Sequence, residues 1–352
     1  MTAEARSAVP SVVAFGGGHG LAASLGALRQ ITPRLTAVVT VADDGGSSGR
    51  LRAEFGMLPP GDLRMALATL AAEDAESASW ADVLQHRFNG FGSLSGHAVG
   101  NLLLAGLVDH FGDPVAALDA AARLLHCAGR VLPLSTQAID IAAEVSGLDP
   151  GRRVEVRGQV AVATTRGRVE SVRLLPARPP ACPEALDAVG AADVLVLGPG
   201  SLFTSMLPHL LVPEMAQAVQ DARAHRVLVL NLAPQPGETA GFAPETHLEV
   251  LAQHAPALRF DVVIADPAAV ADSSALRHAA KALGAEVQLS SVAVGDEPRH
   301  DPTRLAAAFR QAFEILSVQS PPPAHKPRAD AYRSGALSSS ESVPRPPGAP
   351  PR

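Results

Sequence analysis

The sequence predicts an α/β fold: a three-layer, Rossmann-like arrangement around a mainly parallel sheet, with a small antiparallel β insertion. First, short apolar, β-branched runs recur along the chain, at 11–15, 35–41, 193–197, 226–232 and 260–265. Such runs are typical of parallel strands buried on both faces. Second, helical spacing of apolar residues follows several of them, which is the alternation of βαβ units. Third, two of the runs end directly in glycine-rich loops.

Composition argues against several classes of protein. The chain has 352 residues and a formal net charge of −6, with 47% hydrophobic and 18% charged residues, as in an ordinary globular protein. It has no basic run, and aromatic residues make up only 3%, so we expect no nucleic-acid partner. Two cysteines, Cys127 and Cys182, match no metal-ligand spacing and fit a reducing compartment.

We expect a cytoplasmic protein with no membrane insertion, because we find neither a signal-peptide pattern nor an apolar stretch of bilayer length. Residues 1–10 are expected to form a flexible leader, and residues 11–317 the α/β domain. Residues 318–352 are rich in proline and serine and lack periodicity, which predicts a disordered tail.

The first strand, 11–15, runs into a glycine-rich loop before helical spacing begins at Leu21 and continues to 30. In this context backbone N–H groups and the helix N-terminus can bind a phosphate. The spacing fits neither a G-x-G-x-x-G motif nor a P-loop. His19 is either a ligand contact or a spacer. The candidate ligand-binding residues here are Gly16, Gly17, Gly18, His19 and Gly20.

The segment 42–52 concentrates carboxylates, glycines, hydroxyls and guanidinium groups directly after the second strand. Open α/β sheets bind ligands at the carboxyl ends of their strands. Glycines let the backbone turn sharply, hydroxyls can bond phosphate or cap a helix, and arginines can bind anionic oxygens. The alternative is a capped strand-to-helix turn. The candidate ligand-binding residues are Asp43, Asp44, Gly45, Gly46, Ser47, Ser48 and Arg50.

Two further helix starts add candidates. Asp62 follows a Pro-Pro-Gly turn and precedes an Ala/Leu-rich helix, so it is either a cap or, with Arg64, part of the same pocket. His97 and Asn101 are four residues apart near the start of the apolar helix 102–108, and therefore share a face. They form either a structural pair or a ligand-facing cluster.

The second half of the chain predicts an insertion and a second strand–glycine–helix unit. Alternating segments at 154–162 and 169–174 predict an antiparallel insertion over about 131–176. The strand 193–197 then ends in a second candidate anion loop containing Gly198, Gly200 and Ser201, followed by a helix over 202–211. Helices are also expected at 244–254 and 303–315, and Arg299 lies just before the second of these.

Five motifs, in chain order, resemble the YvcK/CofD family, most closely its YvcK-like branch, the gluconeogenesis factors. They are the loop at 16–20, Ala-Asp-Asp-Gly-Gly-Ser-Ser-Gly-Arg-Leu-Arg at 42–52, Pro-Pro-Gly-Asp-Leu-Arg at 59–64, Leu-Ser-Gly-His-Ala-Val-Gly-Asn at 94–101 and Leu-Gly-Pro-Gly-Ser-Leu-Phe-Thr-Ser at 197–205. The resemblance covers about 11–317. His19 departs from it, since threonine is usual there, as does the proline-rich segment 234–236.

This resemblance implies a regulatory protein that binds a nucleotide-sugar, UDP-N-acetylglucosamine, and links gluconeogenic growth to cell shape and cell-wall synthesis. The glycine loops would hold the diphosphate, Asp43 would bind hydroxyls, Arg50 and Arg64 would balance phosphate charge, and Arg299 would contact the nucleotide. No cofactor is required. The resemblance also implies a homodimer and protein partners in cell-wall synthesis.

Two alternatives stay open. One is a CofD-type transferase that moves a phospholactyl-like group from a guanosine diphosphate donor to a deazaflavin. Mg²⁺ would then be held by Asp43 and Asp44, or by Asp44 and Asp62. The small number of aromatic residues makes a stacking site for a deazaflavin hard to assemble. The other alternative is an NAD(P)-dependent dehydrogenase, which the loop spacing fits poorly.

Overall fold

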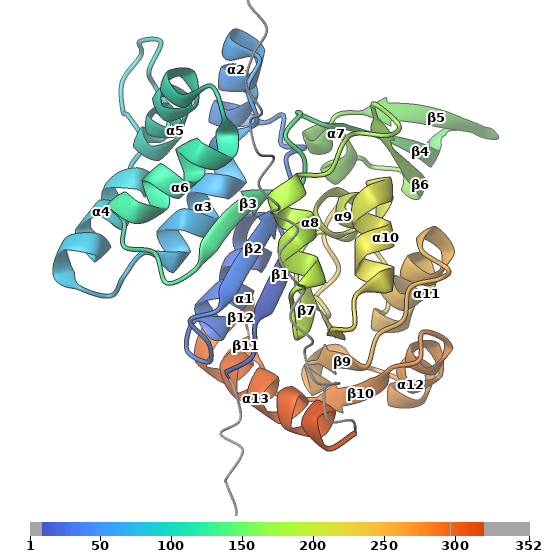
Figure 1. Ribbon diagram of the computed structural model, residues 1–352. Helices are drawn as coiled ribbons and strands as arrows, with labels where there is room; N and C mark the ends of the chain where they lie inside the picture. Colours follow the sequence, from blue (N-terminus) through green and yellow to red (C-terminus); the bar gives the residue numbers. More distant parts are fainter. Residues whose placement is uncertain (1–8, 296, 320–352) are drawn as a thin grey trace, which may run out of the picture.

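The computed structural model describes residues 9–295 and 297–319 of the chain, and it confirms the predicted α/β fold (Figure 1). Its centre is a seven-stranded sheet in which every neighbouring pair is parallel. In spatial order the strands are β10 (Glu286–Leu289), β9 (Val262–Ala265), β8 (His225–Val229), β7 (Val194–Leu197), β1 (Val12–Gly16), β2 (Leu35–Val39) and β3 (Arg130–Pro133). The strand order therefore reverses direction between β1 and β7, as in doubly wound folds.

The central strands form because their apolar runs are covered by helices on both sides. Every residue of β1, β7 and β9 is buried, as expected for parallel strands between two helical layers. At the edge of the sheet, β10 leaves its two end residues, Glu286 and Leu289, exposed. The core therefore lies along β2, β1, β7, β8 and β9.

Two groups of helices cover the two faces of the sheet (Figure 1). On one face α1 (Gly18–Leu28) packs between α3 (Pro60–Leu70) and α13 (Pro302–Gln319), and α4 (Ala75–Gln85), α5 (Val99–Phe111) and α6 (Pro114–Leu124) extend this layer from α3. On the other face successive contacts join α8 (Pro183–Gly190), α10 (Pro213–Asp221), α9 (Leu207–Leu211), α11 (Pro244–His254) and α12 (Ser273–Ala282). These layers confirm the three-layer architecture.

A separate antiparallel sheet confirms the predicted insertion, with different boundaries. It contains β4 (Asp140–Asp149), β5 (Arg152–Arg157) and β6 (Arg168–Leu175) in the order β5-β4-β6. It begins at Asp140 rather than near 131, because residues 130–133 pair with β2 as strand β3. The expected strand 154–162 ends early, since Gly158 takes a φ of 98° and helix α7 (Gln159–Ala163) follows.

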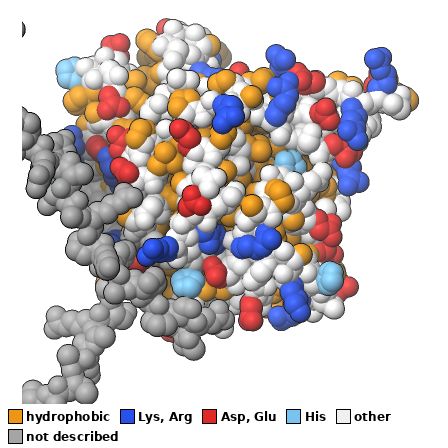
Figure 2. All heavy atoms as spheres, turned by 45° about the vertical axis from the view of Figure 1, so that its right-hand side comes forward, with side chains coloured by type: hydrophobic (Ala, Val, Ile, Leu, Met, Phe, Trp, Pro, Cys, Tyr) orange, Lys and Arg blue, Asp and Glu red, His pale blue; other side chains and the backbone are white. Residues whose placement is uncertain are grey.

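The surface of the insertion carries both signs of charge. Glu155 receives hydrogen bonds from Arg157 and Arg173, both at 2.5 Å, and Arg153 lies 3.5 Å from Glu144. On the face shown in Figure 2, basic and acidic side chains lie next to each other in the same way, with apolar side chains between them. Exposed pairs of this kind contribute little stability, so the insertion relies on its buried residues, and its strands pack on α7 and α9.

Several elements were not predicted from the sequence. These include α8, α10, α12 and β10, and also the short strands β11 (Ala293–Val294) and β12 (Glu297–His300). Most of the expected leader and all but two residues of the expected tail lie outside the described residues, and the division into leader, domain and tail stays a prediction. In the part of the chain that the structure describes, no helix is long and apolar enough to cross a membrane.

Phe309 provides a test of how α13 packs against α1. Its side chain is fully buried on the helix that packs against α1, and its ring stacks on Phe313 at 6.1 Å between centroids. We expect Phe309→Ala to lower the free energy of unfolding by about 3–5 kcal/mol, measured by urea denaturation, because it leaves a cavity. Phe111→Ala is the control, since that ring is 45% exposed. Equal small losses in both variants would contradict this packing.

Candidate functional site

The two predicted glycine loops meet at the reversal point of the sheet. The loop at 16–20 follows β1, the loop at 198–201 follows β7, and these strands are neighbours. A Cβ on Gly20 would lie 2.2 Å from the carbonyl oxygen of Pro199, so only glycine fits there. Ser24, one turn further along α1, donates a hydrogen bond of 2.7 Å to the carbonyl oxygen of Gly198. The crevice outside such a reversal point is where doubly wound sheets bind ligands.

At the N-terminus of α1, the carboxylate of Asp62 lies where a bound anion would otherwise be expected. Asp62, on the first turn of α3, lies against the start of α1, where the backbone N–H of Gly18 favours the ionised form and lowers the pKa of its carboxyl. A Cβ on Gly17 would lie 2.4 Å from the Asp62 Oδ2. Burial, followed by the charge of Asp43, raises the pKa of the Asp62 carboxyl from 3.8 to about 7. Asp62 is therefore both the acid at this helix start and a member of the neighbouring cavity.

The second glycine loop is also held by side chains of the chain. Asn231, after β8, accepts from the N–H of Gly200 at 2.9 Å and donates to the Gly200 carbonyl at 2.8 Å. The Glu238 carboxylate is 3% exposed and accepts hydrogen bonds from the Ser201 hydroxyl and from the N–H groups of Phe203 and Thr204. Burial raises the pKa of the Glu238 carboxyl. Glu238 thus caps the π-helical segment η1 (Leu202–Met206) that leads into α9.

At the N-terminus of α2 (Gly46–Phe55) the N-cap residue is Gly45, which has no side chain that could cap the helix. Its first residues line a cavity of about 370 Å³ near the carboxyl ends of β1 and β2. The start of α3 forms the opposite wall, and the Ser48 hydroxyl joins the two helices by accepting from the Gly61 N–H at 3.0 Å. The residues lining the cavity are Asp43, Gly45, Gly46, Ser47, Ser48, Gly61, Asp62, Arg64, Met65, Arg87 and Asn101.

Arg64 is the distinctive side chain of this cavity. Its residue is only 3% exposed, and its Nε and Nη1 atoms have no hydrogen-bond partner among the described residues. Burial, and then the charge of Arg87, lowers the pKa of its guanidinium group, whereas Asp62 and Asp43 act in the opposite direction. A buried guanidinium group with unpartnered N–H groups is costly unless an anion meets it. Arg64 and the start of α2 are therefore a candidate anion site.

His97 and Asn101 both contact the hydroxyl group of Ser47. Asn101 Nδ2 donates to the Ser47 Oγ at 2.9 Å, and the Ser47 Oγ lies 2.9 Å from the His97 Nδ1. Because Ser47 already accepts from Asn101, its hydroxyl can donate to His97. Burial, and then the charge of Arg50, lowers the pKa of His97, which favours the neutral imidazole that accepts this bond. Asn101 lines the cavity, and its buried Oδ1 has no hydrogen-bond partner among the described residues, whereas His97 contacts Ser47 and does not line the cavity.

The adjacent carboxylates of Asp43 and Asp44 accept hydrogen bonds from different parts of the chain. Asp43 lines the cavity and accepts from the Gly45 N–H at 2.9 Å, whereas Asp44 accepts from the Val160 N–H of α7, also at 2.9 Å. Both expected Mg²⁺ pairs contain Asp44, which lines no part of the cavity. The residues that would fit Mg²⁺ are Asp43 and Asp62, since that ion binds to one or two carboxylates plus a substrate phosphate. Within the described ranges, no group of three metal-binding side chains occurs.

Three other expected residues lie outside the cavity. His19 is exposed on the first turn of α1. The Arg50 side chain turns to the loop before α5, where it donates to the Ser95 carbonyl at 2.7 Å. Arg299 lies in β12 beside Glu297, at 3.3 Å, and does not line this cavity. The ligand-binding roles of all the expected residues stay predictions.

Sequence reasoning missed three residues that the structure brings to the site. Arg87 lines the cavity from the end of α4, with no motif to mark it. Asn231 and Glu238 hold the second glycine loop. The nearest signal was position. Asn231 directly follows β8 and Glu238 lies in the loop after it, and polar residues beyond the end of a buried strand lie at the ligand edge of the sheet.

Comparison with known proteins agrees with this fold. A family model described as "2-phospho-L-lactate transferase CofD" matches residues 12–298. The chain belongs to the CofD family. A solved structure of a UPF0052 family protein from Bacillus halodurans has a TM-score of 0.75 and 34% identity, covering 85% of this chain and 98% of that one.

Relatives within the CofD family carry a different description. The "Putative gluconeogenesis factor" of Mycobacterium tuberculosis is 56% identical over 303 residues, which is 85% of this chain and 89% of that protein. The "Gluconeogenesis factor" of Bacillus subtilis is 36% identical over 313 residues, 85% of this chain and 96% of that protein. The resemblance to the YvcK-like branch is therefore confirmed, and these relatives are named for a metabolic role rather than for the transferase reaction.

The raised pKa of Asp62 predicts a pH dependence of stability. The folded chain holds this proton more tightly than the unfolded chain, so stability from this group is present below about pH 4 and is lost as pH rises towards 7. Compared with Asp62→Asn, whose amide oxygen can still accept from Gly18, the wild type should lose up to about 4 kcal/mol over that window. Urea denaturation at several pH values measures this difference.

The exposed Asp82 on α4 provides the matched control for this titration. Asp82→Asn should leave the difference in unfolding free energy between pH 4 and pH 8 unchanged. If Asp62→Asn also followed the wild type across the whole window, the Asp62 carboxyl would not be the group that titrates there.

Proposed function

We propose that this chain is a regulatory protein that binds a nucleotide-sugar, UDP-N-acetylglucosamine, and links carbon metabolism in gluconeogenic growth to cell shape and cell-wall synthesis. Membership of the CofD family and the names of the relatives support a metabolic role. A cytoplasmic location, self-association and a partner in cell-wall synthesis belong to the same proposal. The ligand site is the cavity between the starts of α2 and α3.

The observation that carries the ligand class is the buried, partly unpartnered guanidinium group of Arg64. It faces the same cavity as the uncapped N-terminus of α2, whose first N–H groups are free to bind anionic oxygens. Arginine and helix N-termini are both preferred phosphate ligands. A phosphate of the ligand would satisfy the N–H groups that the chain itself leaves unpaired.

The same cavity also contains acceptors. Asp43 and Asp62 line it, and at neutral pH they would repel an isolated phosphate. A ligand with hydroxyl groups next to its phosphate resolves this conflict, because hydroxyls donate to carboxylates while phosphate accepts from Arg64. Sugar phosphates and nucleotide-sugars have this arrangement. The glycine loop at 16–20, whose first helical turn Asp62 contacts, lies next to the cavity and supplies close backbone approach.

Arg64 variants test this proposal. We expect UDP-N-acetylglucosamine to bind saturably in calorimetry, and Arg64→Gln to weaken binding by at least about 30-fold, as for the loss of a charged hydrogen-bonding group. Arg64→Lys keeps the positive charge but lacks the planar set of guanidinium N–H donors, so it should bind the nucleotide-sugar at an intermediate affinity. Chromatography of the mixture should recover the nucleotide-sugar intact.

The exposed Arg153 of the insertion is the control residue, and Arg153→Ala should bind as the wild type does. Far-ultraviolet circular dichroism and thermal unfolding identify any Arg64 variant that fails to fold, in which case Asp43→Ala provides the second test of the same cavity. Absence of binding by the wild type, together with Mg²⁺-dependent binding of GDP, would reject this proposal in favour of the transferase alternative.

A further inference from the structure

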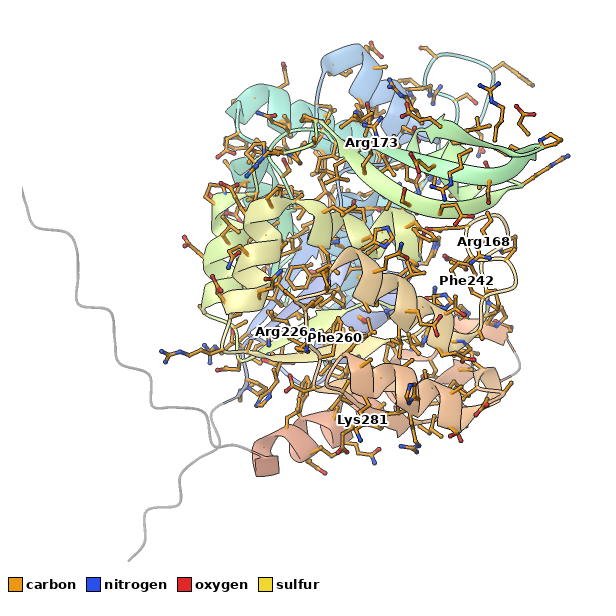
Figure 3. The ribbon with its side chains drawn as sticks, turned by 90° about the vertical axis from the view of Figure 1, so that its right-hand side faces the viewer. Arg168, Arg173, Arg226, Phe242, Phe260 and Lys281 are labelled. Atoms are coloured by element: carbon orange, nitrogen blue, oxygen red, sulfur yellow. The ribbon has the colours of Figure 1, made fainter. Side chains whose placement is uncertain are left out.

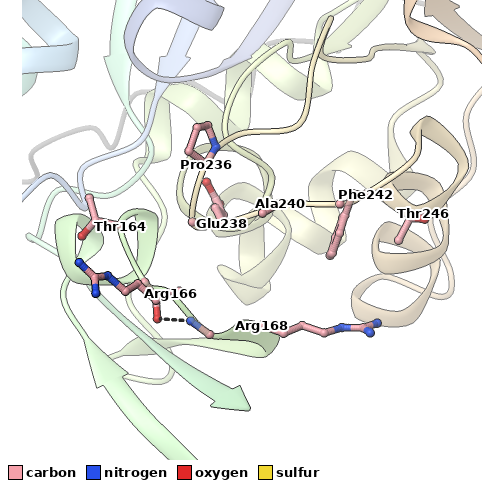
Figure 4. A pocket seen from close by; sticks show the side chains of 12 residues that line it. Thr164, Arg166, Arg168, Pro236, Glu238, Ala240, Phe242 and Thr246 are labelled. Atoms are coloured by element: carbon pink, nitrogen blue, oxygen red, sulfur yellow. Dashed lines mark hydrogen bonds between the residues drawn. The ribbon is translucent and has the colours of Figure 1, made fainter. Parts of the chain in front are cut away.

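We infer that the chain has a second ligand site, which binds a small organic anion with an apolar or ring-shaped body. The site is a cavity of about 750 Å³ between the turn after α7, the loop after β8 and the first turn of α11 (Figure 4). This volume is in the range of small-molecule pockets. The inference is independent of the proposed function, because this cavity shares no lining residue with the cavity at Arg64.

Helix α7 links the segments that surround the two cavities. Its start is held by Asp44, which follows Asp43 of the first cavity, through the hydrogen bond from the Val160 N–H. Its end leads directly into Thr164 and Thr165, which line the second cavity.

The walls of the second cavity are fixed by contacts. A Cβ on Gly237 would lie 2.6 Å from the Ala163 carbonyl oxygen and 3.0 Å from that of Thr165, so the loop after β8 packs closely on the turn after α7. Phe242 is held by edge-to-face contacts with Phe203, at 6.3 Å between ring centroids, and with His247, at 5.6 Å. A preformed wall of this kind lowers the entropic cost of binding.

The charge available to a ligand is positive. Glu238 is the one acidic residue in the lining, and its carboxylate is buried in hydrogen bonds to the start of η1. Arg166 and Arg168 contribute two guanidinium groups from the turn into β6. Among the described residues Arg166 has no ion-pair partner, and the nearest carboxylate to Arg168 is that of Glu170, at 4.0 Å. Phosphate and carboxylate groups are the preferred partners of such arginines.

Phe242 is the reason that the ligand should have an apolar body. In the view of Figure 3, Phe242 and Arg168 lie close together below the antiparallel sheet. Figure 4 shows that the two side chains lie on opposite sides of the cavity, and that Arg166 lies at its other end, beside Thr164. Thr246 of α11 completes the wall behind Phe242, and no side chain caps α11. A ligand that spans this space places its body against the Phe242 ring and its anionic group at an arginine.

Phenyl phosphate is the probe that tests the second site, because it combines a ring with a phosphate group. Titration of the full chain, followed by ¹H–¹⁵N NMR, should shift the amides around Phe242 and Arg168 saturably. Arg166→Ala with Arg168→Ala should weaken binding by at least about tenfold, and Phe242→Leu by about threefold. Inorganic phosphate should bind more weakly than phenyl phosphate, since it lacks the ring.

Controls separate this site from the first cavity. Arg153→Ala, on the same insertion, should bind phenyl phosphate as the wild type does, and saturating UDP-N-acetylglucosamine should not compete with it. Shifts confined to the cavity at Arg64, or equal affinity in the double arginine variant, would overturn the inference. Failure of the nucleotide-sugar to bind would leave these expected results unchanged, so the two proposals fail separately.

Discussion

The reversal of strand order between β1 and β7 is the constraint on which the rest of the site depends. It brings two glycine loops so close together that a Cβ on Gly20 would meet the carbonyl oxygen of Pro199. Helical segments begin at both loops, and their unpaired N–H groups require acceptors. The chain supplies two carboxylates of its own, Asp62 at α1 and Glu238 at η1. Both loops are thereby fixed by carboxylates of the chain, and the start of α2 beside Arg64 is left as the candidate phosphate site of the first cavity.

The cavity at Arg64 combines charges of opposite sign without pairing them fully. Burial and like charge raise the pKa of Asp62, while two nitrogens of Arg64 have no partner in the described structure. An uncompensated buried charge destabilises a fold, so a cavity of this kind indicates a ligand that completes it. A phosphate next to hydroxyl groups meets both requirements. The hydrogen bonds that join Ser47, His97 and Asn101 fix the start of α2 beside this cavity.

Local sequence patterns predicted the strands and the glycine loops, because apolar runs and glycine turns reflect nearby residues. These patterns did not predict features that depend on contacts between residues far apart in the sequence. Residues 130–133 contain arginine and proline and do not resemble a buried strand, yet they form β3 because β2 is available to pair with them. The direction of Asp44 depends on α7, more than one hundred residues away in sequence. Glu238 acts on a helix start that precedes it by over thirty residues, and no local pattern shows this.

The most direct test of the central claim is a crystal structure of the chain with UDP-N-acetylglucosamine. The account predicts a phosphate group within hydrogen-bond distance of the Arg64 guanidinium group and of the first N–H groups of α2. It also predicts a hydroxyl group at Asp43 or Asp62. A nucleotide-sugar bound elsewhere, for example at Arg299 or in the cavity of Phe242 and Arg168, would contradict the account.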